Sequence, residues 1–306
     1  MAQFTRLAAA IAAASLAGAV QAAPTIEWGA DIEFLYEYKD ADDSSTGSTS
    51  KVDLDTAELS MTYSEGKTTA GLTLDAAGDV ELENAFLKYK INDNYTVFAE
   101  NDDTQIGFQL NSAIWSDVLA DDLVDFRATA AGVTISGGPI SSTIYLMSSE
   151  DIEDDLQEFG TQVTYSHDMF NAHFGYISAV LLGEDNSGND VYTDGTGAFS
   201  LGADATINDI TLIAEYNWLS DSVNSNDPTF LHLEANYEMK GYTFAAAYDT
   251  TDEANGIGDA IEDQIALAVT KDISDLLWVQ GELAFQEGYT DNSDTTVATI
   301  IVGATF

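Results

Sequence analysis

The end of the chain shows a strict alternation of side chains. Residues 294–306 read DTTVATIIVGATF: every second position from Ala298 to Phe306 is apolar, and the positions between hold Thr299, Ile301, Gly303 and Thr305. Successive side chains of a β-strand point to opposite faces, so this pattern predicts a strand that runs to Phe306. We expect it to pair with a strand at residues 25–38 and thereby to close a sheet.

Residues 25–38 show the same alternation, with one apolar and one acidic face. The apolar face consists of Ile26, Trp28, Ala30, Ile32, Phe34, Tyr36 and Tyr38. Further alternating segments lie at 52–63, 80–91, 157–166, 210–218, 229–239 and 276–287. Aromatic residues near both ends of an apolar face suit the two interfaces of a membrane-spanning barrel.

The sequence offers no helical membrane span beyond its N-terminal segment. No later stretch reaches the ~18 uninterrupted apolar residues that a spanning helix needs. A closed barrel is the alternative, because it leaves no backbone group unpaired in lipid. The chain also contains no cysteine, so an exported fold of this size must be held together by means other than disulfides.

The connections between the segments come in two lengths. Seven are tight turns made of turn-forming residues, at Ser64–Lys67, Asn92–Asn94, Ser136–Pro139, His167–Asn171, Asn208–Asp209, Lys240–Gly241 and Asp272–Asp275. Eight are longer loops, at Lys39–Lys51, Asp75–Asp79, Asp102–Asp125, Ser149–Leu156, Gly183–Thr196, Ser220–Asp227, Thr250–Ala260 and Glu287–Ser293. We therefore predict an all-β fold, a transmembrane antiparallel up-and-down β-barrel of about 16 strands, with about 14 or 18 as alternatives.

The N-terminus is typical of a secretory signal peptide. Arg6 supplies a positive charge, residues 7–20 are apolar and rich in alanine, and Val20-Gln21-Ala22 offers small residues for cleavage. We expect residues 1–23 to be the signal peptide and residues 24–306 to be a barrel in the outer membrane of a Gram-negative bacterium.

The charge balance is strongly acidic. The sequence has 9 Lys and Arg against 53 Asp and Glu, a formal net charge of −44. Such a chain repels the phosphate backbone of nucleic acids, which excludes a nucleic-acid partner. A disordered acidic chain is also excluded, because 45% of the residues are hydrophobic and they alternate regularly. Two explanations stay open: a cation-selective lumen, or a saline habitat in which acidic surfaces keep proteins soluble.

Acidic residues on the polar faces of the strands are the candidate pore lining. They are Glu27, Asp31, Glu33, Glu37, Glu58, Glu215, Glu234, Glu238 and Glu282. A wall of this kind repels anions and concentrates cations. The basic residues available to oppose it are Lys88, Lys90 and Arg127, too few for the basic ladder that a phosphate-selective pore needs.

Residues 101–125 break the alternation and form the longest connection. They carry apolar residues without a simple period, which favours packing inside the barrel over exposure to water. We predict that this segment is a constriction loop that narrows the lumen; the alternative is two ordinary strands at 104–110 and 112–119. The candidate constriction residues are Asp102, Asp103, Gln105, Asp117, Asp121, Asp122 and Arg127. Arg127 either opposes acids across the pore or pairs with nearby acids such as Asp122 and Asp125.

Three motifs in residues 86–149 carry a family resemblance. They are FLKYKINDNYTVFAEND at 86–102, TQIGF at 104–108, and IWSDVL at 114–119 ahead of a strand that opens at Phe126-Arg127. This part of the chain resembles the LbtU-type siderophore porins and, more distantly, the phosphate-selective and carbohydrate porins. The chain has Ile106 and Val118 where that family has proline. The resemblance implies a porin, and porins of about this size are often homotrimers.

Sequence features of an enzyme or a metal site are weak. His167, His173 and His232 are the only histidines, and none has metal-ligand spacing to another. The acidic loop at residues 184–190 does not fit the EF-hand pattern. We expect no enzyme activity, no cofactor and no dedicated metal site, with Ca²⁺ or Mg²⁺ held loosely by the acidic loops as an alternative.

The sequence thus predicts a passive, cation-preferring diffusion channel for small solutes, in contact with membrane lipid and lipopolysaccharide. Two alternatives remain at this point. One is a substrate-specific porin for uptake of a siderophore or metal complex, and the other is a non-conducting structural barrel.

Overall fold

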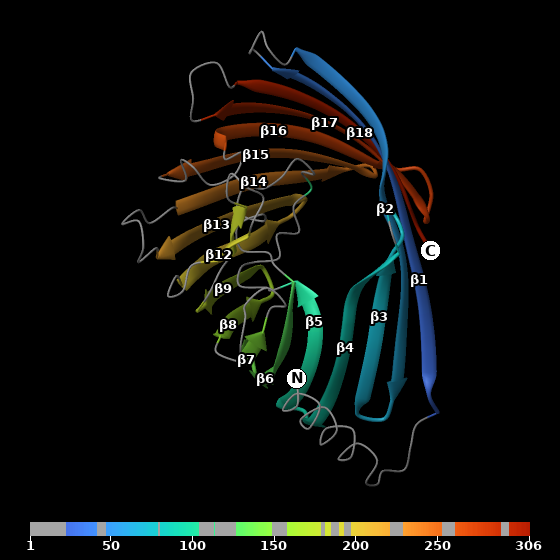
Figure 1. Cartoon of the computed structure of the whole chain (residues 1–306), viewed down its shortest axis with the longest axis vertical. Coiled ribbons are helices and arrows are strands. Elements are labelled where there is room, and N and C mark those ends of the chain that lie inside the picture. The colour runs from blue at the N-terminus through green and yellow to red at the C-terminus, as the bar shows by residue number, and fades with distance from the viewer. Residues whose placement is uncertain are drawn as a thin grey trace.

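The computed structural model describes residues 23–41, 47–78, 80–103, 113, 127–148, 158–178, 181–184, 190–192, 197–220, 229–252, 261–288 and 294–306. They form a closed antiparallel barrel of 16 strands, as predicted, and a separate two-stranded sheet, β10–β11 (Figure 1). The barrel strands are β1 (Thr25–Ala41), β2 (Ser48–Glu65), β3 (Thr68–Asp75), β4 (Glu81–Asn92), β5 (Tyr95–Asp103), β6 (Arg127–Gly137), β7 (Ile140–Ser148), β8 (Glu158–His167), β9 (Phe170–Ile177), β12 (Gly197–Ile207), β13 (Ile210–Ser220), β14 (Thr229–Met239), β15 (Tyr242–Asp252), β16 (Ile261–Asp272), β17 (Leu277–Gly288) and β18 (Thr295–Thr305). The small sheet consists of β10 (Leu181–Glu184) and β11 (Asp190–Tyr192).

The first and last strands close the barrel. β1 pairs with β18 from Asp31 opposite Thr305 to Ala41 opposite Thr295. Beyond the end of β18, the Phe306 N–H donates to the Ala30 carbonyl at 2.8 Å, and the Ala30 N–H donates back at 3.2 Å. The predicted pairing of the chain end with residues 25–38 is therefore confirmed, and β18 lies beside β1 in Figure 1.

All seven predicted short turns lie between paired strands, and the longer connections lie at the opposite end of the barrel. The Lys240-Gly241 turn has φ of 54° and 73° at its two central residues, the left-handed pair that a two-residue hairpin favours. Two of the predicted loops were too long. β1 continues to Ala41, β2 begins at Ser48 and β15 continues to Asp252, because the backbone ladder runs beyond the apolar band into polar residues that carry no hydrophobic period.

Residues 104–126 add no strand to the barrel wall. β5 pairs directly with β6, with Asp103 opposite Arg127, and the barrel closes at 16 strands. The alternative of two further wall strands at 104–110 and 112–119 is therefore wrong. The small β10–β11 sheet begins two residues before the predicted loop Gly183–Thr196 and otherwise falls inside it.

The two faces of the wall differ as the alternation predicts. Large apolar side chains are exposed on the outer face, where Phe159, Tyr176, Phe199 and Trp218 form a row of aromatic contacts across β8, β9, β12 and β13. Such rows suit the interface between lipid and water. The part of the chain that the structure describes contains no helix with the length and hydropathy of a membrane span.

Gly303, on the inward face of β18, tests the packing of the inner face next to the closing strands. It lies opposite Trp278, and a Cβ built on it would come within 2.2 Å of the indole ring. We expect Gly303→Val to displace the ring and lower the free energy of unfolding by about 1–3 kcal/mol. Denaturant unfolding of the barrel in lipid, followed by the heat-dependent gel shift of folded barrels, measures this. Gly281→Val is the matched control, since a Cβ at Gly281 on β17 meets open space; equal losses in both variants would contradict the prediction.

Candidate functional site: the barrel interior

The nine predicted pore-lining carboxylates all lie on inward-facing positions of their strands. They alternate with the exposed apolar residues, and cross-strand pairs such as Asp31–Glu58 on β1 and β2 keep them on one face. Their surroundings, however, fall into two groups. On β1 and β2 the carboxylates of Asp31, Glu33, Glu37 and Glu58 are partly exposed, whereas Glu215, Glu234 and Glu282 on the opposite wall are 4%, 4% and 6% exposed. Glu27 and Glu238 are exposed near the short-turn end.

The few inward-facing lysines belong to the β1–β5 part of the wall. Lys51 lies 3.9 Å from Glu37, and Lys88 lies 3.4 Å from Glu100. Lys90 pairs with Asp93 at the short-turn end. Acids still outnumber these cations on the same strands. Asp31, Glu33 and Glu58 have no lysine among their cross-strand neighbours, so lysine does not compensate their charge there.

A row of polar side chains runs across the opposite wall. Direct cross-strand neighbours in this row are Glu215, His232, Asp249, Gln264 and Gln286, on β13 to β17. His232 Nδ1 lies 2.5 Å from Asp249 Oδ1, Gln264 Nε2 donates to Asp249 Oδ2 at 3.3 Å, and Gln286 Nε2 donates to Gln264 Oε1 at 2.8 Å. Hydrogen bonding of this kind satisfies polar groups that are removed from water.

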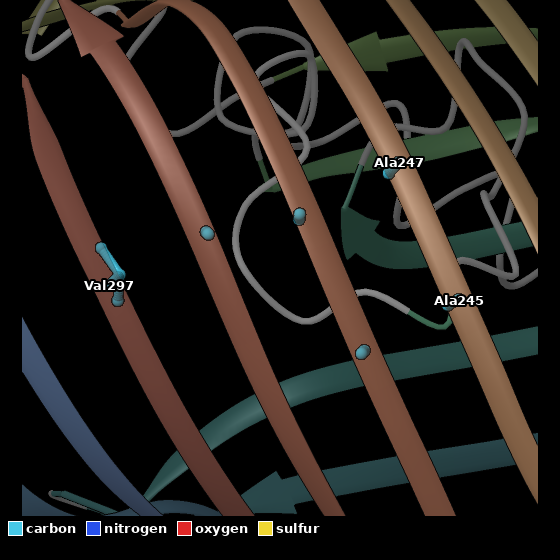
Figure 2. Close-up of a cluster of buried hydrophobic side chains, with 6 residues drawn as sticks. Ala245, Ala247 and Val297 are labelled. Atoms are coloured by element: carbon cyan, nitrogen blue, oxygen red, sulfur yellow. The ribbon is translucent and has the colours of Figure 1, made fainter.

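Ala113 places the predicted constriction segment inside the barrel. Its backbone N–H donates to Glu234 Oε1 at 2.9 Å, and its carbonyl accepts from Gln280 Nε2 at 3.1 Å. Its side chain packs on a patch of small inward-facing residues on β15 to β18, which we call the alanine patch: Ala245, Ala247, Ala266, Ala268, Ala284 and Val297 (Figure 2). The predicted entry of residues 101–125 into the barrel is therefore confirmed at Ala113.

The predicted constriction residues lie mostly beyond what the structure describes. Asp102 and Asp103 end β5 and Arg127 begins β6, but their side chains are outside the described part of the chain. Gln105, Asp117, Asp121 and Asp122 are outside the described residues altogether. Their role at a constriction, including both readings of Arg127, stays a prediction.

Sequence reasoning missed the alanine patch and the partners of His232. The signal for the patch was present: in FAAAY at 244–248 and IALAV at 265–269, alanine occupies the face that is acidic in other segments. A small apolar residue at an inward position indicates close packing rather than a water-filled wall. His232 lies on the inward face of β14, and its contact with Asp249 depends on the register between β14 and β15.

The described residues include no group of three His, Asp or Glu side chains arranged for a metal ion. In the acidic loop at 184–190, Glu184 and Asp190 pair between β10 and β11, and residues 185–189 lie outside the described part. Loose binding of Ca²⁺ or Mg²⁺ by the acidic loops stays a prediction.

Comparison with solved structures identifies the fold. The chain is similar to the outer membrane channel DcaP of Acinetobacter baumannii, at 10% identity and a TM-score of 0.65 over 92% of this chain and 97% of DcaP. It is similar to the trimer form of OmpT of Vibrio cholerae (14%, TM-score 0.67, 93% and 100%) and to a mutant of the Rh. blastica porin (16%, TM-score 0.60, 92% and 100%). No family model and no curated protein matches the sequence. At these identities the likeness shows the fold, which is that of bacterial outer-membrane β-barrels, and the resemblance to LbtU-type porins stays a prediction.

The position of Ala113 against the alanine patch can be tested by cross-linking, because the chain has no native cysteine. We expect the pair Ala113→Cys and Ala266→Cys to be joined by a short bifunctional thiol reagent, since Ala113 packs on the patch that contains Ala266. A shift in mobility on a denaturing gel reports the link. The control pair, Ala113→Cys with Ala246→Cys, should stay unlinked because Ala246 lies on the outer face of β15. Equal linking of both pairs would refute the lumenal position.

Proposed function

We propose that this protein is an outer-membrane porin, a water-filled, cation-preferring channel for passive diffusion of small solutes. The observation that carries the proposal is the partly exposed carboxylate wall of β1 and β2, inside a closed 16-strand barrel. Barrels of this strand number leave an aqueous channel when side chains do not fill them. Similarity to an outer membrane channel and to a porin supports the class.

The sign of selectivity follows from the charges that water can reach. Asp31 of β1 lies opposite Glu58 of β2, Asp75 of β3 lies opposite Glu58, and Glu33 lies two residues along β1 from Asp31 on the same face. Fixed negative charges on low-dielectric walls raise the local concentration of cations and lower that of anions. The buried carboxylates of the opposite wall contribute less to a permeating ion, because hydrogen bonds from neighbouring side chains already compensate them.

Ala113 narrows the bore next to the β14–β17 wall. Its contacts with Glu234 and Gln280 hold backbone against β14 and β17, so part of the lumen next to this wall is occupied. Solutes then pass between Ala113 and the acidic β1–β2 wall. The mechanism is electrodiffusion, with no chemical step and no cofactor.

The remaining parts of the proposal concern location and partners. The outer, apolar face of the barrel contacts lipid and lipopolysaccharide of the outer membrane, and the protein is not an enzyme. Homotrimer formation is supported by the similarity to OmpT in its trimer form.

Uptake of a siderophore or metal complex is the alternative that the sequence resemblance suggests. It predicts a saturable block of ion current by the ligand, whereas a diffusion channel shows no saturation at the same concentrations. A non-conducting structural barrel predicts no current at all.

Cation preference is tested by the reversal potential under a salt gradient in a planar bilayer. We expect the wild type to prefer cations, and Glu33→Gln with Glu58→Gln to lower the cation-to-anion permeability ratio about twofold or more, because two carboxylates leave the partly exposed wall. The control is Asp209→Asn with Asp275→Asn, which removes the same charge from two exposed turns at the barrel rim. Anion preference in the wild type, or an equal effect of both double variants, would overturn the charge argument.

A further inference from the structure

The buried wall holds three carboxylates around a single histidine. Glu234 and Asp249 flank His232, and Glu215 is its direct cross-strand neighbour on β13. Residues 104–126, the segment that contains Ala113, include no Lys or Arg. Among the described residues, the ion pairs of lysine involve Glu37, Glu100 and Asp93, all on other strands and turns.

Buried carboxylates of this kind need compensation. An ionised carboxylate taken out of water is strongly unfavourable unless a cation or several donors face it. Glu215 has neutral donors, since Ser200 Oγ and Asn217 Nδ2 donate to its Oε1 at 3.1 and 2.9 Å. Asp249 and Glu234 instead share the imidazole of His232, which is 2% exposed.

The ring of His232 is oriented to serve both acids. Nδ1 lies 2.5 Å from Asp249 Oδ1, and Nε2 lies 3.4 Å from Glu234 Oε2. A neutral imidazole has one N–H and one lone pair, so one of the two carboxylates would face a lone pair. The imidazolium form donates from Nδ1 to Asp249 and places its positive charge within ion-pair distance of Glu234.

Glu234 links this ring to the segment in the lumen. Its Oε2 faces His232, while its Oε1 accepts the N–H of Ala113 at 2.9 Å. A carboxylate held at one oxygen has a fixed orientation at the other. We propose that His232 is a positioning residue: as an imidazolium it bridges Asp249 and Glu234, holds Glu234 toward Ala113, and loosens this contact when it loses its proton.

The described groups around His232 define how pH acts on this bridge. The titratable groups that face it are Glu234 on β14, Asp249 on β15 and Glu215 on β13; the other residues of the row, Gln264 and Gln286, do not titrate. Raising the pH removes the ring proton and leaves Nε2 as an acceptor opposite a carboxylate. Lowering the pH protonates Glu234, which removes the charge that the ring compensates. The contact between Glu234 and Ala113 is therefore strongest at a pH above the protonation of Glu234 and below the deprotonation of the His232 ring.

The protonation state can be read directly. The full chain contains only three histidines, His167, His173 and His232. Magnetic resonance of the barrel in lipid nanodiscs, with heavy-nitrogen-labelled histidine, distinguishes imidazolium from either neutral tautomer. We expect an imidazolium signal near neutral pH that disappears in His232→Gln and persists in His173→Gln, the matched control for a second buried histidine. A neutral His232 ring at every pH at which the barrel is folded would overturn the proposal.

The coupling to Ala113 needs a second readout. The labelling rate of Ala113→Cys by a water-soluble thiol reagent is compared at one pH in backgrounds that differ only at residue 232, so that thiol ionisation cancels. We expect His232→Gln to raise the rate roughly tenfold, the effect of weakening a hydrogen bond to a charged group, and His173→Gln to leave it unchanged. An unchanged rate in His232→Gln would refute the coupling.

A back-up variant keeps this inference testable, and a last outcome separates it from the proposed porin function. If His232→Gln does not fold, Glu234→Gln serves instead: it keeps an oxygen for Ala113 but removes the charge, and we expect the His232 imidazolium signal to be lost at a lower pH than in the wild type, because only Asp249 then compensates the ring. An unchanged midpoint of this loss would overturn the bridge. Consequences for ion current rest on the proposed function, but neither readout requires ion flow, so a non-conducting wild type overturns the porin proposal alone.

Discussion

The rest of this structure depends on one constraint: backbone N–H and C=O groups must be paired in a membrane without help from water. A sheet meets this requirement only when its first and last strands meet, and here β1 and β18 pair over eleven positions, with Phe306 extending the ladder to Ala30. Closure then fixes the two faces. Apolar side chains must point outward to lipid, so almost every polar group of the strands must point into a lumen of limited width.

That crowding explains why the two halves of the wall differ. On β13 to β17 the carboxylates of Glu215, Glu234, Asp249 and Glu282 are buried, and neighbouring glutamine, asparagine, serine and histidine side chains contact them. On β1 and β2 the acids are partly exposed, and hydration compensates Asp31, Glu33 and Glu58 instead. The inward polar face of the barrel therefore has two roles. The β13–β17 wall bonds the backbone at Ala113, and the β1–β2 wall faces solvent.

The sequence predicted what depends on local pattern. The period of two predicted the strands and the face of each acid, and turn-forming residues such as Lys240-Gly241 predicted the short hairpins. The sequence could not predict that Glu33 is partly exposed while Glu234 is buried, because burial depends on which wall Ala113 contacts. Nor could it predict that His232 meets Asp249, since cross-strand partners follow from register, which the hydrophobic pattern fixes only to within two residues.

The alanine patch and the two polar side chains that bond the backbone of Ala113 are parts of one arrangement. Glu234 and Gln280 bond the N–H and the carbonyl of the same residue, so the backbone at Ala113 must approach within hydrogen-bond distance of both β14 and β17. Only small side chains beside these contacts permit that approach, and Ala247 on β15, Ala266 on β16 and Ala284 on β17 occupy the successive cross-strand positions next to Glu234. Larger residues there would hold the segment away from the wall and leave two buried polar side chains without these partners, a cost of about 1–3 kcal/mol each. The small residues of β15 to β17 and the acid on β14 therefore act together in holding Ala113 against this wall.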